Sequence, residues 1–284
     1  MIGRPPRAGF AHRREHDHPR AHASADRFSR AVPVTDGPFF LVDTVPAAGE
    51  FRFAGPEGRH AAAVRRLRVG ETLVLTDGRG RRAAGTVLEV GRAELIVQLD
   101  AAVTIDSPAV RVTMVQALPK GDRGELAVEL ATEAGVDEIV PWAASRCVAR
   151  WTADRADRGH ARWQNAAREA AKQSRRSYVP VVHDLASTAA VAARIREAAG
   201  AVLLHESAER PLTAIPLPAA GDLLLVVGPE GGVSGEELAL FRRAGAAAVR
   251  LGPEVLRTST AGVVALGALG VLTGRWRDPD RSRQ

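Results

Sequence analysis

The spacing of hydrophobic residues divides the chain into two parts. Between residues 31 and 106, short apolar runs with alternating or clustered branched residues are separated by turns such as Asp77-Gly78-Arg79-Gly80. This pattern is typical of β-strands joined by tight turns, so we predict a small β-barrel here. The predicted strands lie at 39–42, 71–75, 82–90 and 93–99, and helical spacing of apolar residues predicts one helix at 58–67.

From Val110 onward, strand-like apolar runs alternate with helix-like segments, after a break at Ser107-Pro108. The predicted strands lie at 110–117, 137–141, 179–182, 201–204, 223–227 and 247–251. The predicted helices lie at 123–133, 159–174, 188–199, 235–243 and 260–272. Repeated β-α units of this length predict an α/β fold with a mostly parallel sheet covered on both faces. We therefore expect a second domain at residues 107–284.

The first 30 residues differ from both parts in composition. They hold seven arginines and three acidic residues, which is +4 of the net charge of +6. They also hold four of the eight histidines and almost no hydrophobic periodicity, which is typical of a disordered extension. The remaining +2 says little about residues 31–284. The extension is either a floppy tail from an over-long start, or a contributor to RNA affinity.

Cysteine content and the longest apolar run bear on the compartment. Cys147 is the single cysteine, which excludes an intrachain disulfide and a cysteine-based zinc cluster. We expect a reducing, cytoplasmic setting and no metal. The run 261–272 is shorter than the roughly 18 residues that span a bilayer, and no apolar stretch follows Arg13-Arg14. We therefore expect neither a membrane segment nor an export signal.

A glycine-rich loop, Gly228-Pro229-Glu230-Gly231-Gly232, follows the predicted strand 223–227. It precedes a helix opened by Ser234 and Glu237, which have the spacing of a capping box. Ligands of open parallel sheets bind beyond the carboxyl ends of strands, where glycines let backbone amides approach closely. The loop lacks the lysine of a P-loop and the G-x-G-x-x-G spacing, which disfavours a phosphate site. A tight structural turn is the alternative.

A second loop, from Leu251 to Ala261, also joins a strand end to a helix start. Thr258, Ser259 and Thr260 are good helix caps, so their hydroxyls have a purely structural explanation. Arg257 has none, because a cation beside a helix N-terminus is unfavourable unless it pairs with an acid or faces an anion. Arg257 is therefore a candidate functional residue.

Three further segments carry charged or polar residues. Lys120-Gly121-Asp122-Arg123 follows a predicted strand, and Gln173-Ser174-Arg175-Arg176 ends a predicted helix. Both are candidates for contact with a phosphate backbone, and simple solvation at the surface is the alternative. His205-Glu206 follows the strand 201–204 and so lies at the same sheet edge as the glycine loop, although such a pair is a weak signal of acid-base chemistry.

Taken together, six ordered motifs resemble the RsmE family of the SPOUT class of RNA methyltransferases. They are the KGDR segment at 120–123, Glu133-Ala134-Gly135-Val136, Ser145-Arg146-Cys147, Gln173-Ser174 with Arg176, the loop 228–232, and Leu256-Arg257-Thr258. In the N-terminal part, His60, residues 65–70 and residues 77–80 look like the family's PUA-like RNA-binding barrel. The resemblance covers about residues 37–276.

The resemblance implies a trefoil-knotted domain, a homodimer, and methylation of N3 of a uridine in 16S rRNA of the 30S subunit by S-adenosylmethionine (SAM). The implied SAM-binding residues are Leu204, His205, Glu206, Gly228, Pro229, Glu230, Gly231, Gly232, Leu251, Gly252, Leu256, Thr258, Ser259 and Ala261. The implied RNA-binding residues are Arg65, Arg66, Arg68, Lys120, Arg123, Gln173 and Arg176. Arg257 and Glu230 are the implied catalytic residues.

Two positions depart from the family pattern. Ser259 stands where many relatives carry an acid between two threonines, which excludes a catalytic carboxylate at 259, and Glu254 stands where a basic residue is common. Two other functions stay open: methylation of a ribose 2′-oxygen by a SPOUT enzyme, and a non-catalytic RNA-binding role in ribosome assembly. The barrel and the motifs at 120–123 and 173–176 argue against the first.

Overall fold

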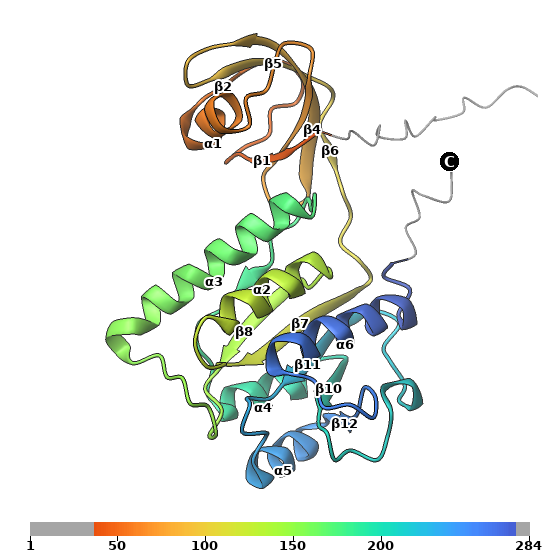
Figure 1. The fold of residues 1–284 in the computed structure, drawn as a ribbon. Helices are drawn as coiled ribbons and strands as arrows, with labels where there is room; N and C mark the ends of the chain where they lie inside the picture. The colour runs from red at the N-terminus through yellow and green to blue at the C-terminus, as the bar shows by residue number, and fades with distance from the viewer. Residues whose placement is uncertain (1–36, 277–284) are drawn as a thin grey trace, which may run out of the picture. The chain divides into compact units, whose positions relative to one another are not determined.

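The computed structural model describes residues 37–276, without the side chains of 153–155, so the extension expected at residues 1–30 lies outside the described residues. Two sheets organise the described part of the chain (Figure 1). The N-terminal sheet has the strand order β1-β3-β4-β5-β2, and β6 pairs with β4. Its strands are β1 (Phe39–Leu41), β2 (Gly49–Phe53), β3 (Thr72–Thr76), β4 (Arg81–Val90), β5 (Leu95–Leu99) and β6 (Val103–Thr104). We refer to residues 37–104 as the N-terminal module.

The N-terminal module has its own core. Phe40 of β1 and Phe53 of β2 meet edge to face, with ring centroids 5.4 Å apart, and Leu73, Leu75 and Leu95 are fully buried beside them. Neighbouring strands are antiparallel, except for the parallel pair β1 and β3. The four predicted strands are confirmed, and two more are present. β2 has the sequence GEFRF, which holds too few apolar residues to stand out, and β6 has only two residues.

The helix predicted at 58–67 is wrong in its bounds and in its buried face. The chain forms a short α-helix, α1 (Gly55–Arg59), and then a π-helical turn, η1 (His60–Val64). Val64, which was expected on the buried face, is 67% exposed. Helical geometry ends before Arg66, which adopts a left-handed conformation with φ of 54°, and Leu67 then returns to the core through a turn.

The second sheet, which was predicted to be mostly parallel, is parallel throughout, with the order β12-β10-β11-β7-β8-β9. Its strands are β7 (Val110–Ala117), β8 (Glu138–Trp142), β9 (Val181–Val182), β10 (Gly200–Leu204), β11 (Gly221–Val227) and β12 (Ala247–Val249). β7 and β11 are its long central strands, paired from Val110 with Gly221 to Gln116 with Val227. The carboxyl ends of all these strands therefore meet at one edge.

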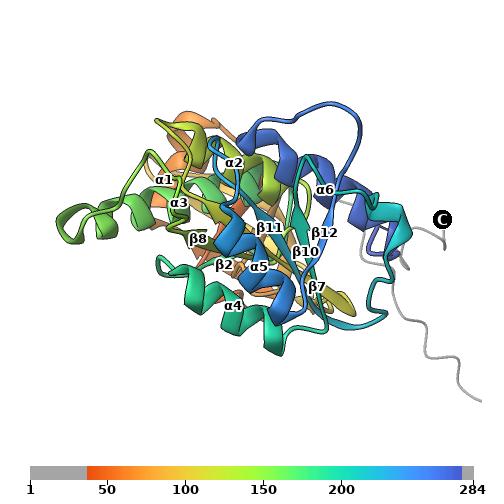
Figure 2. The ribbon, with the colours of Figure 1, turned by 90° about the horizontal axis from the view of Figure 1, so that it is seen from below.

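Helices cover both faces of this sheet, as predicted (Figure 2). α2 (Arg123–Glu133) packs against α3 (Ala153–Gln173) and α6 (Thr258–Leu272), whereas α4 (Thr188–Glu197) packs against α5 (Gly235–Ala244). A single 3-10 turn, η2 (Leu212–Ala214), precedes β11. α3 begins at Ala153, six residues before the predicted start at 159. The prediction missed these residues because 153–158 carry almost no apolar side chain and so show no hydrophobic periodicity. None of the described helices is long and apolar enough to cross a membrane.

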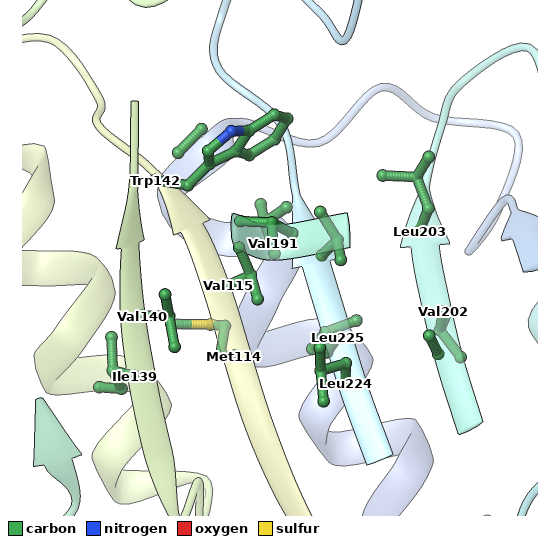
Figure 3. Packing of buried hydrophobic residues seen from close by; sticks show 14 of the residues in the cluster. Met114, Val115, Ile139, Val140, Trp142, Val191, Val202, Leu203, Leu224 and Leu225 are labelled. Atoms are coloured by element: carbon green, nitrogen blue, oxygen red, sulfur yellow. The ribbon is translucent and has the colours of Figure 1, made fainter. Parts of the chain in front are cut away.

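The strands of the parallel sheet bury consecutive side chains on both faces (Figure 3). Met114 and Val115 of β7 and Leu224 and Leu225 of β11 are each at most 4% exposed. A strand covered on both faces reads as a continuous apolar run rather than as an alternation. The core is closed at the carboxyl edge by Trp142, whose ring lies 5.2 Å from that of Phe241 on α5.

The predicted capping box at the start of α5 is present and extends further than a helix cap. The Ser234 hydroxyl accepts a hydrogen bond from the Glu237 N–H at 3.2 Å, and the Ser234 N–H donates to Glu237 Oε2 at 3.0 Å. Glu237 Oε1 also accepts from the Ser145 N–H at 2.7 Å and from the Thr188 hydroxyl at 3.2 Å. One buried carboxylate thus joins the loop after β8 to the starts of α4 and α5.

The pKa of Glu237 follows from this arrangement. Burial alone would raise it, but the hydrogen bonds from Ser145 and Ser234 favour the charged form and bring the pKa below its ordinary value of 4.5. The carboxylate therefore stabilises the fold fully above the pKa of the unfolded chain. This stabilisation is lost as the pH falls through the lower pKa of the folded state.

We expect Glu237→Gln to lower the free energy of unfolding by about 2 kcal/mol at pH 7, because one amide hydrogen would face a backbone N–H. The difference from the unsubstituted chain should shrink as the pH falls below the usual carboxyl pKa. Urea denaturation between pH 3 and 7 measures both effects. Glu236→Gln is the matched control, because Glu236 is exposed in the same helical turn. A pH-independent difference would contradict this account.

Candidate active site

A cavity of about 510 Å³ lies at the carboxyl edge of the parallel sheet. It is lined by the loops that follow β10, β11 and β12, by the start of α6, and by single residues from the loop after β8 and from α2. Its volume falls within the roughly 300–1,000 Å³ typical of small-molecule and cofactor sites. The cavity therefore occupies the place at which open parallel sheets bind their ligands.

The glycine loop forms one wall of this cavity. A Cβ on Gly228 would lie 2.7 Å from Cγ2 of Val233, so the turn after β11 closes only with glycine at 228. Gly232 has a φ of +73°, a conformation that L side chains rarely adopt. The loop therefore presents backbone rather than side chain to the cavity over most of its length.

The loop after β12 is fastened to the glycine loop through Thr258. The Thr258 hydroxyl is buried and donates to the carbonyl of Gly228, so the start of α6 and the end of β11 are held together. The expected capping role of the three hydroxyls is wrong, because α6 already begins at Thr258 and Arg257 is its N-cap residue. The Thr260 hydroxyl donates to the Arg257 carbonyl at 3.2 Å instead of accepting from the helix.

Glu230 and Arg257, the two predicted catalytic residues, both line the cavity. Glu230 Oε1 accepts from the backbone N–H of Lys120 at 3.1 Å and lies 3.7 Å from Arg123 Nη1. Arg257 is exposed, and among the side chains that the structure describes no acidic one lies within ion-pair distance of it. Glu230 therefore does not pair with Arg257, because the segment after β7 engages its carboxylate.

Arg146 is a cavity residue that sequence reasoning did not single out for a role. It follows β8, and its Nη1 donates to the Gly231 carbonyl at 3.2 Å. A Cβ built on Gly232 would lie 4.0 Å from Arg146 Nη1 and 3.9 Å from Glu206 Oε1. An exposed cation and an exposed carboxylate thus lie near the same glycine. In the sequence, Arg146 appeared only within the motif Ser145-Arg146-Cys147, which did not indicate a chemical role for it.

Thirteen of the fourteen predicted SAM-binding residues line the cavity, and Ser259 is the exception. Its side chain is 5% exposed, because the first turn of α6 points it into the protein. The lining residues that the prediction omitted from this set are Arg123, Arg146, Val227, Val233, Val249, Arg250, Glu254, Val255 and Arg257. Of the apolar ones, Val227 and Val249 end strands, whereas Val233 and Val255 lie in loops, and none of the four carries a reactive group that would mark it in the sequence.

The predicted RNA-binding residues fall into three places. Arg65, Arg66 and Arg68 are exposed on the turn after η1, and Lys120, Arg123 and Gln173 are exposed on the parallel domain. Arg176 instead turns inward, where Nη1 donates to the Thr132 carbonyl at 2.7 Å. Burial lowers its pKa to about 10. An RNA phosphate would have to compete with this internal hydrogen bond.

Neither nucleophilic nor metal chemistry is favoured by the other polar groups. Burial raises the pKa of the Cys147 thiol, and its Sγ lies 3.8 Å from the Trp142 carbonyl, so it stays a protonated core side chain. The His205 Nδ1 accepts from the Ser207 N–H at 3.2 Å, which leaves the proton of a neutral ring on Nε2. No group of three metal-ligating side chains occurs within residues 37–276.

Comparison with known proteins agrees with the two-part organisation. A family described as an RNA methyltransferase domain matches residues 106–270, and an RNA methyltransferase PUA domain matches residues 53–100. Ribosomal RNA small subunit methyltransferase E of Mycobacterium tuberculosis is 52% identical over 242 residues, which are 84% of this chain and 92% of that protein. The Bacillus subtilis protein of the same name is 29% identical and covers 81% of this chain and 93% of its own length.

Solved structures give the same result. Ribosomal RNA small subunit methyltransferase E from Neisseria gonorrhoeae, bound to S-adenosyl methionine, superimposes with a TM-score of 0.73 at 26% identity. The match covers 83% of this chain and 98% of that one. A Legionella pneumophila methyltransferase in complex with SAM gives a TM-score of 0.71 at 26% identity, covering 84% and 98%. The resemblance to the RsmE family is confirmed, and the chain belongs to the ribosomal RNA small subunit methyltransferase E family.

Proposed function

We propose that this chain transfers a methyl group from SAM to N3 of a uridine in 16S rRNA of the 30S subunit. The observation that carries the proposal is the cavity at the carboxyl edge, which combines a backbone-lined glycine loop with an unpaired arginine. The family membership and the SAM-bound relatives support the same reaction. The proposed compartment is the cytoplasm, where 30S subunits are found.

The cavity suits SAM by size and by chemistry. Its apolar lining from Leu204, Val227 and Leu251 offers packing for an adenine ring, and the adjoining backbone offers amides and carbonyls for its polar edge. Four arginines and three glutamates also line it. This mixture suits a ligand that carries both a carboxylate and cationic groups better than it suits a polyphosphate.

Within this cavity we assign the methionine end of SAM to Arg146 and Glu206. Glu206 Oε1 and Arg146 Nη1 lie 3.9 and 4.0 Å from the point where a Cβ on Gly232 would be, so an amino-acid group placed over this glycine is near both a carboxylate and a cation. In this assignment Arg146 binds the α-carboxylate and Glu206 binds the α-ammonium. Such charge-assisted hydrogen bonds are stronger than neutral ones.

Arg146→Ala should weaken the binding of S-adenosylhomocysteine about tenfold or more, as expected for loss of a hydrogen bond to a charged group. Binding of 5′-methylthioadenosine, which lacks the amino-acid group, should not change. Isothermal titration calorimetry measures both, and Arg242→Ala on α5 is the matched control. Equal weakening for the two ligands would instead make Arg146 a brace of the Gly231 carbonyl.

The proposed chemistry explains why the cavity needs a cation but no strong base. SAM supplies a methyl group on a cationic sulfonium. N3 of uracil is a weakly acidic imide nitrogen, and the charge left after it loses its proton spreads onto the two flanking carbonyl oxygens. Arg257 is placed to stabilise this charge, since no described acid neutralises its guanidinium. The base must be unpaired, because N3 lies on its pairing edge.

Glu230, the other predicted catalytic residue, is proposed to act by positioning the segment after β7. Its carboxylate accepts from the Lys120 N–H and faces Arg123. In the proposed mechanism it fixes the segment after β7 at the cavity mouth.

Arg257→Ala should lower turnover by roughly 100-fold or more, the scale seen when one preorganised charge-stabilising donor is removed. The affinity for SAM should change little. Arg257→Lys should rescue only part of the activity, because a point charge cannot reproduce the planar fork of the guanidinium. Steady-state kinetics on 30S subunits at saturating SAM measures the effect. A variant whose only defect is weaker SAM binding would remove Arg257 from the catalytic role.

The proposed RNA contacts divide between two domains, with residues 31–106 as the PUA-like barrel and 107–284 as the methyltransferase domain. The exposed Arg65, Arg66 and Arg68 lie on the first. On the second, the exposed Arg123 lines the cavity, and the exposed Lys120 lies three residues before Arg123 and donates its backbone N–H to Glu230. A contact from each domain would place the RNA before the cavity. Residues 1–30 are proposed to add electrostatic attraction and to have no part in folding or methyl transfer.

We also propose that the chain is a homodimer. α6 is apolar on all sides, and Val264 and Val271 on it are 47% and 63% exposed, with Val255 in the preceding loop at 80%. Exposed apolar side chains on one helix and its adjoining loop support an interface with a second copy. Sedimentation equilibrium at micromolar concentration should give twice the chain mass of 30.1 kDa.

The proposed function is tested by methyl transfer from labelled SAM to 30S subunits and to free rRNA, with reverse transcription to locate the product. A methyl group at N3 blocks base pairing and should stop reverse transcription at one uridine. Labelling without such a stop would favour ribose 2′-O methylation. SAM binding without any transfer would favour a role in ribosome assembly.

A further inference from the structure

A second cavity, of about 300 Å³, lies beside the first. Its walls are the segment after β7, the start of α2, the loop before α3, and α3 itself. The lining residues are Leu118, Pro119, Gly121, Gly124, Glu125, Ala149, Arg150, Trp151, Arg162 and Trp163, and none of them lines the first cavity. Gly121 is the one lining residue that belongs to a family motif, and the proposed methyl transfer assigns this cavity no role.

Two tryptophans give this cavity an aromatic wall. Trp151 and Trp163 meet edge to face, with ring centroids 5.3 Å apart and an interplanar angle of 78°. Trp163 is 2% exposed, whereas Trp151 is only half-buried. A Cβ on Gly159 would lie 2.4 Å from the Trp151 ring, and one on Gly124 would lie 2.7 Å from Nε1 of Trp163. Both rings are therefore held by close packing against helix backbone.

Two arginines and one glutamate, Glu125, lie beside the aromatic wall, so the charge there is net positive. Arg150 and Arg162 line the cavity and are exposed, and Arg162 Nε lies 3.1 Å from Glu125 Oε1. An aromatic face with arginines beside it is the combination that binds unpaired bases of RNA, by stacking and by contact with the phosphates. A purely structural aromatic cluster needs no exposed arginines and no open cavity.

The position of the second cavity relative to the first indicates which nucleotide it suits. The segment 118–124 separates them: the Lys120 N–H and Arg123 contact Glu230 of the first cavity, whereas Gly121 and Gly124 line the second. A strand of RNA with its target base in the first cavity would cross this segment on the way to the second. The neighbouring nucleotide would reach the second cavity.

We propose that the second cavity binds an unpaired base of the RNA substrate, next to the target nucleotide, by stacking against Trp151. Arg150 and Arg162 contact the phosphates on either side of this base. The proposal rests on the proposed function, since it requires RNA at the first cavity. In this proposal the cavity holds the RNA strand in an unstacked conformation. Methylation at N3 requires this, because N3 lies on the pairing edge of the base.

Tryptophan fluorescence tests the proposal directly, because the chain has four tryptophans and Trp142 and Trp163 are buried. In a Trp276→Phe background, Trp151 is the one tryptophan that remains accessible. Titration with single-stranded hexauridylate, with S-adenosylhomocysteine saturating, should quench its emission. Trp151→Leu should weaken hexauridylate binding about tenfold or more, as expected for loss of one stacked base. Trp151→Phe should keep most of the affinity.

Two controls separate this role from a structural one. The affinity for S-adenosylhomocysteine and the melting temperature should stay unchanged in Trp151→Phe. Arg150→Ala should weaken hexauridylate binding and reduce its salt dependence, whereas Arg242→Ala on α5, on the other face of the sheet, should do neither. If Trp151→Leu does not fold, the proposal is tested by the quenching of Trp151 and by the comparison of Arg150→Ala with Arg242→Ala.

Two results would overturn the proposal. One is unchanged emission of Trp151 at hexauridylate concentrations that saturate binding. The other is unchanged affinity in a folded Trp151→Leu variant. Failure of the proposed function looks different, because RNA would still bind and quench Trp151 while no methyl group reached N3.

Discussion

Parallel alignment of the strands is the constraint on which the site depends. Because β7, β8, β10, β11 and β12 all run in the same direction, their carboxyl ends open at one edge and their loops converge there. Converging loops carry backbone polar groups and charges that need partners. Glu237 supplies them for the loop after β8, and Thr258 ties α6 to the glycine loop. The cavity is thus the space left between loops that are already fixed.

The charged side chains of the cavity differ in whether they have a partner. Glu230 accepts from the Lys120 N–H and faces Arg123, whereas Arg146 and Glu206 both lie close to Gly232. Arg257 has no described acid beside it, so its positive charge is available to a ligand. A cavity built in this way discriminates by where charge develops on a bound molecule. Preorganised dipoles and cations are effective because they need not reorient during the reaction.

Much of this architecture is predictable because buried strands and amphipathic helices obey short-range periodicities. The apolar runs of β7 and β11 and the capping box of α5 are examples. Failures arise where a tertiary contact overrides the local pattern. Thr258 uses its hydroxyl on Gly228 instead of capping α6, and Arg176 turns toward Thr132 instead of toward solvent. The trefoil knot stays a prediction, since no periodicity encodes how a chain threads through itself.

The segment after β7, residues 118–124, contacts both cavities. Its Lys120 N–H is held from one side by Glu230, and Gly121 and Gly124 form a wall on the other. A ligand that shifts this wall changes the free energy of occupancy on both sides. Thermodynamic linkage makes such an effect reciprocal: whatever cofactor binding contributes to the affinity for RNA, RNA returns to the affinity for cofactor. The hydrogen-bonded backbone of this segment would then determine whether SAM and RNA bind independently or cooperatively.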